Sequence, residues 1–141
     1  RWDAAFIDAL TLDVLMHPAA YDVIVTTNMF GDILSDAAGY LVGGLGLLPS
    51  ANIGDRYALF EPVHGSAPDI AGRNQANPIA ALRSGAMLLE YLGDPASARA
   101  IESAIWGAVA QGIRTRDMGG SAGTREFGDV VVEILERQGR R

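Results

Sequence analysis

A β-branched run that leads directly into an amphipathic segment is the feature that most constrains the fold of this chain. Residues 21–27 read YDVIVTT, a composition favoured in strands and typical of a parallel strand covered on both faces. Asn28 to Gly31 turn the chain, and a helix is predicted from Asp32 to about Leu41. Because a strand followed by a helix is the repeating unit of α/β folds, we predict an α/β fold.

The rest of the chain alternates helical periodicity with stop signals. Four more segments carry apolar residues at helical spacing and are predicted helices: 2–16, 78–92, 97–110 and 124–137. In the last of these, Phe127, Val131 and Leu135 form the predicted core face. Two short apolar runs, 45–48 and 57–60, predict strands, and the turn-rich residues between them predict a loop.

Composition narrows the possible partners of the chain. With 141 residues, of which 49% are hydrophobic, the chain can bury a sizeable core. The formal charge of −6 disfavours a nucleic acid, and no apolar run approaches the roughly 20 residues of a membrane span. The lack of cysteine excludes a disulfide framework and fits a reducing, cytoplasmic location. The chain begins at Arg1, so we expect the natural start to lie upstream.

Two aspartates on the helix that follows residues 21–27 are candidate metal ligands. Asp32 and Asp36 are four residues apart and therefore project from one helix face, where like charges mildly destabilise an isolated helix. A divalent cation is one reason for such a pair, because Mg²⁺ and Mn²⁺ favour carboxylate oxygens. The alternative is that Asp32 benefits from the helix dipole and Asp36 is simply solvated. Residue pattern alone leaves both interpretations open.

Residues 60–72, FEPVHGSAPDIAG, form a shaped loop after a short strand. Pro62 stops the strand, and the small residues allow backbone N–H groups to approach a ligand closely. His64 offers a ring for stacking or hydrogen bonding, and Asp69 can accept two hydrogen bonds from a diol. These groups suit a nucleotide, although an ordinary proline-rich connection has the same composition.

This loop, with Asn77 and Pro78 beyond it, closely resembles the cofactor loop of the β-decarboxylating dehydrogenases. That family includes 3-isopropylmalate, isocitrate, homoisocitrate and tartrate dehydrogenases. The resemblance runs from Phe6 to Leu135 and includes FIDAL, TNMFGDILSD and GGSAGT at residues 6–10, 27–36 and 119–124. It implies the C-terminal part of an isopropylmalate dehydrogenase-like α/β fold, with helices packed on a mixed, mainly parallel sheet. It assigns residues 1–43 to the dimerisation and metal-site domain, and 44–141 to the C-terminal part of the cofactor-binding domain.

The resemblance also implies an activity. Family members oxidise the 2-hydroxyl of a malate-type acid by hydride transfer to a nicotinamide and release the 3-carboxylate as CO₂. By the resemblance, Asp32 is the leading ligand of Mg²⁺ or Mn²⁺, Asp36 supports it, and Asp8 joins from the partner subunit of a homodimer. Asp8 and Asp32 are thus also catalytic-site candidates. The catalytic lysine of the family has no counterpart in this lysine-free chain, so we expect the chain alone to be inactive.

For the cofactor, the resemblance places Glu61 near the nicotinamide end and implies that the Asp69 carboxylate binds the ribose hydroxyls. Because that carboxylate would repel a 2′-phosphate, NAD is predicted over NADP. The other implied cofactor-binding residues are His64, Gly65, Ser66, Ala67, Ile70 and Asn77.

The branch of the family stays open. Many members have GKGIANP where residues 72–78 of this chain read GRNQANP. A 3-isopropylmalate-type substrate is favoured, with isocitrate, homoisocitrate and tartrate types as alternatives. A non-catalytic regulatory subunit and a stand-alone nucleotide-binding module are rivals from other classes; the intact Asp8, Asp32 and Asp36 count against the first.

Overall fold

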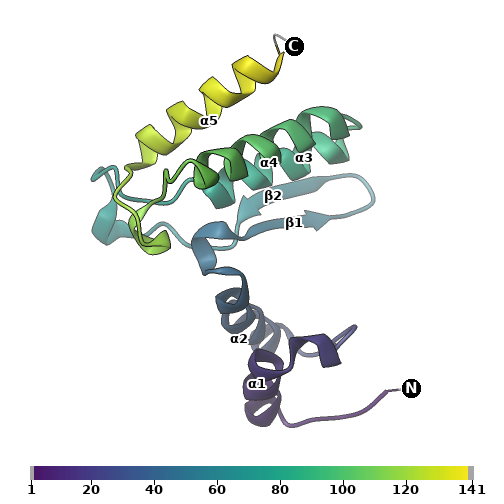
Figure 1. The fold of residues 1–141 in the computed structure, drawn as a ribbon. Coiled ribbons are helices and arrows are strands. Elements are labelled where there is room, and N and C mark those ends of the chain that lie inside the picture. The colour runs from purple at the N-terminus through teal and green to yellow at the C-terminus, as the bar shows by residue number, and fades with distance from the viewer. Residues whose placement is uncertain (1, 140–141) are drawn as a thin grey trace. The chain divides into compact units, whose positions relative to one another are not determined.

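A computed structural model describes residues 2–139 of the chain, which form helices and one short β-ribbon (Figure 1). The chain divides into two compact units, Arg1–Gly44 and Leu45–Arg141. This boundary lies one residue from the predicted division, while the roles predicted for the two parts stay predictions. Within residues 2–139, no helix is long and apolar enough to cross a bilayer.

The first unit is built on two helices, α1 (Ile7–Met16) and α2 (Asn28–Gly39). They pack on each other through a small apolar contact in which Val14 and Leu34 are buried. Pro18 begins a short 3-10 turn just after α1 ends, because its ring cannot continue the helical hydrogen-bond ladder. Both helices were predicted; α1 begins five residues later and α2 four residues earlier than the sequence pattern suggested.

The strand predicted at residues 21–27 is wrong for the chain described here. These residues have no regular secondary structure, and Val23 and Val25 are 82% and 92% exposed. A strand satisfies its backbone N–H and C=O groups only through a neighbouring strand. No strand lies beside these residues within the described range, and the local pattern cannot supply one.

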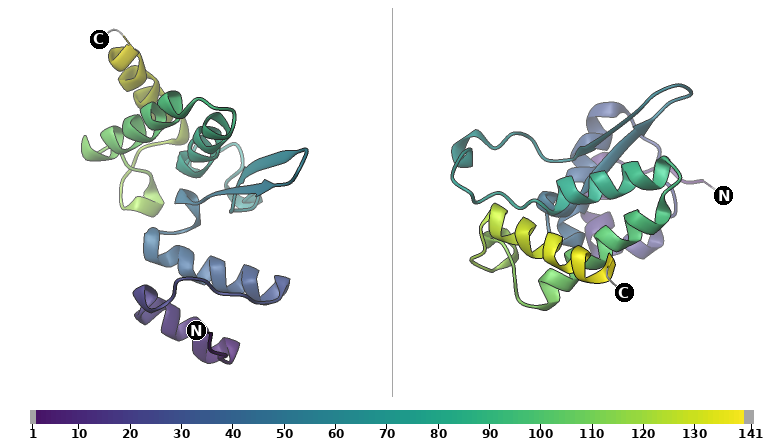
Figure 2. Two further views of the ribbon diagram at one scale, coloured as in Figure 1. Left: turned by 90° about the vertical axis from the view of Figure 1, so that its right-hand side faces the viewer. Right: turned by 90° about the horizontal axis from the view of Figure 1, so that it is seen from above.

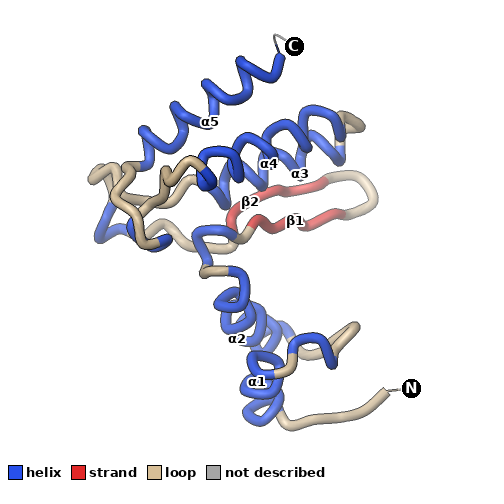
Figure 3. The backbone as a smooth tube through the Cα atoms, viewed as in Figure 1, coloured by secondary structure: helices blue, strands red, loops and turns tan. Residues whose placement is uncertain are grey.

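The second unit opens with a two-stranded antiparallel ribbon of β1 (Pro49–Ile53) and β2 (Ala58–Pro62). In its register Ala51 faces Phe60, and Pro49 faces Pro62 at one end, where the missing N–H of proline is tolerated. Figure 3 shows this ribbon in red. The predicted mainly parallel sheet is therefore not formed by residues 2–139. The strand predicted at 45–48 is instead a 3-10 turn, Leu45–Leu47.

Three helices follow the ribbon in the sequence: α3 (Ile79–Tyr91), α4 (Pro95–Ala110) and α5 (Thr124–Gly139). Helix α3 packs against both strands and against α4, and α4 in turn packs against α5 (Figure 2). The Asp94 carboxylate caps α4 by accepting a hydrogen bond from the Ser97 backbone N–H at 3.0 Å. The helix predicted at residues 97–110 therefore begins two residues earlier than the sequence pattern suggested.

The core of the second unit lies between these helices. Ile79, Ile105 and Phe127 have no exposed surface, and Val131 is 2% exposed. Burying each such side chain contributes about 1.5–3 kcal/mol. The core face predicted for the last helix is confirmed at Phe127 and Val131, while Leu135 is only partly buried at its edge.

Candidate functional site

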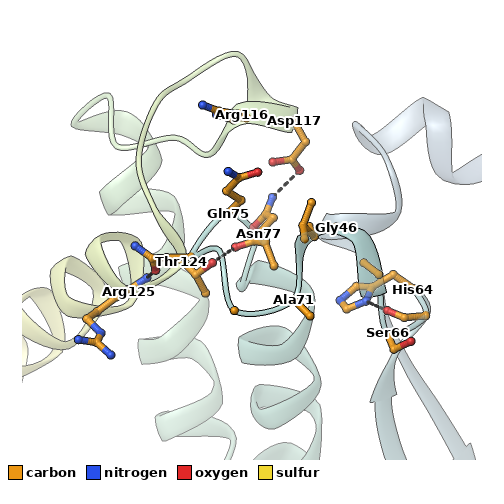
Figure 4. Close-up of a pocket in the computed structure, with 16 residues that line it drawn as sticks. Gly46, His64, Ser66, Ala71, Gln75, Asn77, Arg116, Asp117, Thr124 and Arg125 are labelled. Carbon is orange, nitrogen blue, oxygen red and sulfur yellow. Dashed lines mark hydrogen bonds between the residues drawn. The ribbon is translucent and has the colours of Figure 1, made fainter.

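An open pocket of about 1030 Å³ lies in the second unit (Figure 4). Three segments far apart in the sequence form its walls: the turn Leu45–Leu47, the loop after β2, and residues 116–125. Seven of the sixteen lining residues are glycine, alanine or isoleucine, and the other nine carry polar side chains. Apolar surface combined with placed polar groups is typical of small-molecule sites, and the volume is at the upper end of their usual size.

The loop after β2 presents one wall of the pocket. Val63 N–H donates to the Leu48 carbonyl at 3.1 Å, which ties the start of the loop to the residue just before β1. The His64 Nδ1 lies 2.8 Å from the Gly65 carbonyl oxygen. Because a carbonyl only accepts, Nδ1 carries the proton in this contact and Nε2 of the neutral ring is left as an acceptor. A Cβ added at Gly65 would meet nothing within 4 Å, so the backbone here is open to a ligand.

A pair of side chains joins the loop to residues 116–125. Asn77 Nδ2 donates to Asp117 Oδ2 at 2.8 Å, and Asn77 Oδ1 accepts from the Ile79 backbone N–H at 2.9 Å. The buried Thr115 hydroxyl donates to Asp117 Oδ1 at 2.5 Å. The Asn77 carboxamide therefore donates to a carboxylate at one end and accepts from a backbone N–H at the other, and these two bonds fix its orientation.

The turn Leu45–Leu47 closes the pocket against this pair. A Cβ at Gly46 would lie 2.9 Å from Asp117 Oδ2 and 3.1 Å from Asn77 Cβ, so a larger residue there would have to displace these side chains. Arg83 holds the turn in place: its Nη1 donates to the Leu47 carbonyl at 2.8 Å, and its Nε pairs with Glu102 at 2.9 Å. Arg83 therefore links the turn beside the pocket to helices α3 and α4.

The candidate metal acids all lie in the first unit. Asp8 is in the first turn of α1, and Asp32 and Asp36 are one turn apart on α2. All three side chains are exposed. Among the residues described, the only side-chain hydrogen bond to the carboxylate of Asp32 or Asp36 is the 3.4 Å contact from Asn28 Nδ2 to Asp32 Oδ2. Within residues 2–139, no cluster of three or more histidine, aspartate or glutamate side chains is arranged to hold a metal ion.

Comparison with known proteins decides the family. The model of the isocitrate/isopropylmalate dehydrogenase family matches residues 1–131. The chain belongs to the isocitrate/isopropylmalate dehydrogenase family. It is 55% identical over 130 residues to the isocitrate/homoisocitrate dehydrogenase of Thermus thermophilus, covering 92% of this chain and 39% of that enzyme. It is 53% identical over 137 residues to the 3-isopropylmalate dehydrogenase of Aquifex aeolicus, covering 94% of this chain and 38% of that enzyme.

The solved structures confirm the fold class. The isocitrate dehydrogenase of Methylococcus capsulatus matches with a TM-score of 0.85 and 48% identity, over 92% of this chain and 39% of that one. The chain is thus an α/β fragment of this dehydrogenase fold and spans about two fifths of the length of the relatives it matches.

Within this dehydrogenase chain, the pocket gathers most of the predicted cofactor residues. Its lining includes six of them: His64, Gly65, Ser66, Ala67, Ile70 and Asn77. Glu61 and Asp69 do not line it. Glu61 lies in β2 opposite Ser50, and Asp69 is exposed on the 3-10 turn Pro68–Ile70. Whether these residues bind a cofactor stays a prediction.

Sequence reasoning assigned no site role to the second half of the lining. The residues missed here include Asn74, Arg116, Asp117, Thr124 and Arg125. The GGSAGT stretch at 119–124 was recognised, but a contact such as Asn77 to Asp117 joins residues 40 apart. Only the way α3 and α4 return the chain to the loop brings them together, and local pattern carries no signal of that return. The metal set also stays a prediction, because it takes Asp8 from a second subunit.

Proposed function

We propose that this chain is part of an NAD-dependent β-decarboxylating dehydrogenase and supplies its dinucleotide pocket together with acids of its metal site. The proposed reaction is oxidative decarboxylation of a 2-hydroxy-3-carboxy acid, 3-isopropylmalate type first. The observation that carries the proposal is the pocket, because its lining includes six residues that the sequence predicts to bind a nucleotide. The names of the relatives support the same reaction class and keep isocitrate and homoisocitrate as alternative substrates.

The lining of the pocket fits an anionic nucleotide. It carries two arginines, Arg116 and Arg125, and one carboxylate, Asp117, which gives 2 − 1 = +1 of formal charge in a chain of −6. Locally positive surface in an otherwise acidic chain raises the local concentration of anions. Asn77 and Asp117 supply donors and acceptors of fixed orientation, and small residues leave the backbone of the His64 loop accessible.

The donor set of the first unit fits a hard divalent cation. Asp32 and Asp36 present carboxylate oxygens, the ligands that Mg²⁺ and Mn²⁺ prefer, from adjacent turns of α2. The set is incomplete within one chain, and the proposal therefore requires a homodimer in which Asp8 comes from the partner subunit. When bound, the dinucleotide supplies a hydride acceptor and the cation supplies Lewis-acid chemistry at the substrate oxygens.

The residues of this chain bind and orient in this scheme, because the chain lacks the lysine expected for proton transfer. Asp32 and Asp36 would hold the divalent cation, and Asn77 and the His64 loop would orient the dinucleotide. Accurate positioning is itself a large contribution, since a well-oriented pair of reactants avoids much of the entropic barrier. Tests of activity accordingly belong in the complete dehydrogenase polypeptide.

The decisive assay measures NADH formation and CO₂ release by the complete dehydrogenase with 3-isopropylmalate, isocitrate, homoisocitrate and tartrate. We expect turnover with one of them, and an Asp32→Asn variant that loses at least about a hundredfold in kcat/KM. Asp129→Asn, on the exposed side of α5, is the matched control and leaves turnover unchanged. Absence of NADH formation from all four acids contradicts the proposal. Tight NAD binding by the 141-residue chain without metal or partner would instead favour a stand-alone nucleotide-binding module.

The preference for NAD has its own test. Asp69 adjoins Ile70 in the pocket wall, whereas Arg116 and Arg125 offer charges that suit a 2′-phosphate. We expect the wild type to favour NAD, and Asp69→Lys to shift the ratio of kcat/KM values toward NADP by about tenfold or more. Asp55→Lys, in the exposed turn between β1 and β2, is the control. Equal or better efficiency of the wild type with NADP would refute the preference.

A further inference from the structure

The first turn of α5 lacks a capping side chain of its own. The helix begins at Thr124, so its N-cap is Gly123, which has no side chain to accept a hydrogen bond from the first-turn amides. Half of a capping box is present, because Gly123 N–H donates to Glu126 Oε2 at 3.3 Å. The other half requires an acceptor for the amide of the second or third helical residue.

Asn74 supplies this acceptor from the loop after β2. Its Oδ1 accepts from the Arg125 backbone N–H at 2.9 Å, across 51 residues of sequence, and its backbone carbonyl accepts from Thr124 N–H at 3.2 Å. The Thr124 hydroxyl in turn donates to the Ala76 carbonyl at 2.5 Å. Figure 4 shows this last bond beside Asn77. Three hydrogen bonds therefore fasten the loop to the start of the helix.

The backbone is shaped for this contact at two positions. Asn74 has a φ of +56°, a left-handed conformation that asparagine tolerates better than most residues. Gly123 has no room for a side chain: a Cβ there would lie 2.4 Å from Asn74 Nδ2 and 3.0 Å from the Asn74 carbonyl oxygen. Asparagine at 74 and glycine at 123 are thus matched to each other.

Every partner in this contact belongs to the pocket. Asn74 and Ala76 line one wall, and Thr124 and Arg125 line the other. The Asn77–Asp117 hydrogen bond is the next side-chain link between these two walls. The cap therefore sets the separation of the walls at the end of the pocket where α5 begins.

We propose that Asn74 is a positioning residue for the ligand of this pocket: by capping α5 from the opposite wall, it holds Asn77 and the α5 start at the spacing that the ligand requires. The inference rests on the proposed dinucleotide binding and adds a residue to it. Asn74 acts through the α5 start and through Asn77, so its effect on binding is indirect.

The cap is tested first without any ligand, by amide hydrogen exchange on the 141-residue chain. Asn74→Gly removes the acceptor and keeps the left-handed backbone accessible. Asn74→Asp retains the oxygen and adds a charge that the helix N-terminus favours. We expect Asn74→Gly to speed exchange of the Arg125 amide by about tenfold, as for the loss of one hydrogen bond, and Asn74→Asp to stay near wild type. Asn52→Gly, the same substitution at an exposed site in β1, leaves Arg125 exchange unchanged.

The effect on the ligand is tested in the complete dehydrogenase, with NAD as the probe. We expect Asn74→Gly to raise the KM and Kd for NAD by roughly three- to tenfold while kcat changes less than about twofold, because only the spacing of the binding walls is altered. A general loss of stability would lower the active fraction, and so kcat, and would leave KM unchanged. Asn52→Gly again serves as the control.

Three outcomes overturn the inference. Unchanged Arg125 exchange in Asn74→Gly shows that the cap is not formed. Faster exchange with unchanged KM for NAD shows that the cap supports the helix only. A raised KM with unchanged exchange shows that Asn74 contacts the ligand directly. If the wild-type enzyme binds no dinucleotide, the proposed function fails and this inference fails with it, which distinguishes that result from the other three.

Discussion

The two units of the chain differ in how much of their apolar surface they bury themselves. In the first unit the large side chains Trp2, Phe6 and Val25 are 88%, 86% and 92% exposed. In the second unit Ile79 and Phe127 have no exposed surface. Both units have well-formed helices, so the difference does not lie in local helix formation.

This difference shows that helix pattern and core formation are separate properties of a sequence. An apolar stripe makes a helix amphipathic, but the helix is stabilised only when another surface covers the stripe. Helices α3, α4 and α5 cover one another, whereas Val14 and Leu34 are the buried apolar side chains that α1 and α2 contribute. Large exposed apolar patches mark surfaces that take part in further association. We therefore expect the stability of the chain to reside in the second unit.

The largest expected effect comes from the core of the second unit. Phe127→Ala leaves a cavity in that core and should lower the free energy of unfolding by about 3–5 kcal/mol. Phe6→Ala, at a site that is 86% exposed, should change it by less than about 0.5 kcal/mol. Urea denaturation followed by far-UV circular dichroism monitors the helices of both units, and Trp106 fluorescence in a Trp2→Phe background monitors the second unit separately. An equal loss of unfolding free energy in the two alanine variants would contradict the difference between the units.

Two glycines extend the comparison to the backbone. A Cβ at Gly120 would lie 2.1 Å from the Arg114 carbonyl oxygen, so Gly120→Ala must shift the loop that carries Asp117 and should cost about 1–3 kcal/mol. At Gly31 in α2 the nearest neighbour is the Thr26 side chain at 3.3 Å, which can move. We expect Gly31→Ala to be tolerated within about 1 kcal/mol, because alanine also favours the helix. Urea midpoints of the two variants compare the effects, and a greater loss for Gly31→Ala would contradict this.

Each unit contains one carboxylate whose lowered pKa makes the stability of that unit depend on pH in the acid range. The hydrogen bonds from Ser97 hold the pKa of Asp94 below its ordinary value of 3.8, and a hydrogen bond from Tyr21, with a smaller one from His17, does the same for the pKa of Asp13. A lowered pKa contributes stability that is present above pH 3.8 and is lost as the pH falls through the folded-state value.

Asp94→Asn keeps an oxygen at the α4 cap and removes this titration. We expect the urea midpoint of the second unit to be higher in the wild type than in Asp94→Asn at neutral pH, with the difference vanishing at low pH. Asp13→Asn should leave the Trp106-monitored transition unchanged at every pH, because Asp13 belongs to the other unit. A difference between wild type and Asp94→Asn that persists at low pH would show that the cap does not depend on charge.

The smallest expected effect is a gain. Gly128 lies inside α5, and a Cβ there would meet nothing within 4 Å. Gly128→Ala should therefore stabilise the second unit by about 0.5–1 kcal/mol through helix propensity alone. A small rise in the melting temperature by differential scanning calorimetry measures it. A loss of stability would indicate that α5 needs a flexible residue near its start.

Sequence predicted best what is determined locally. Helix α5 and its core residues Phe127 and Val131 follow from spacing alone, and so do the helices of the first unit apart from their ends. The strand at 21–27 failed because strand formation needs a neighbour that the local pattern cannot provide. β1 was missed because Pro49 and Asn52 suggest a turn, while its pairing with Ala58–Pro62 makes a ribbon.

The candidate site divides in the same way. The His64 loop was found because its letters are distinctive and contiguous. The roles of Asn74 and Asp117 were missed because each depends on a partner that is brought close only by the folded helices. The three aspartates of the predicted metal site remain a prediction, since their proposed meeting requires two subunits.

The tight approach of Gly46 has a consequence for protein engineering. Because this residue packs directly on Asn77 and Asp117, the pocket wall includes the first turn through which the backbone enters the second unit. A portable version of this module, intended for grafting onto another scaffold, should start no later than Leu45. The linker to the new scaffold should join the chain before this turn, because a junction between residues 46 and 49 would disrupt the pocket wall.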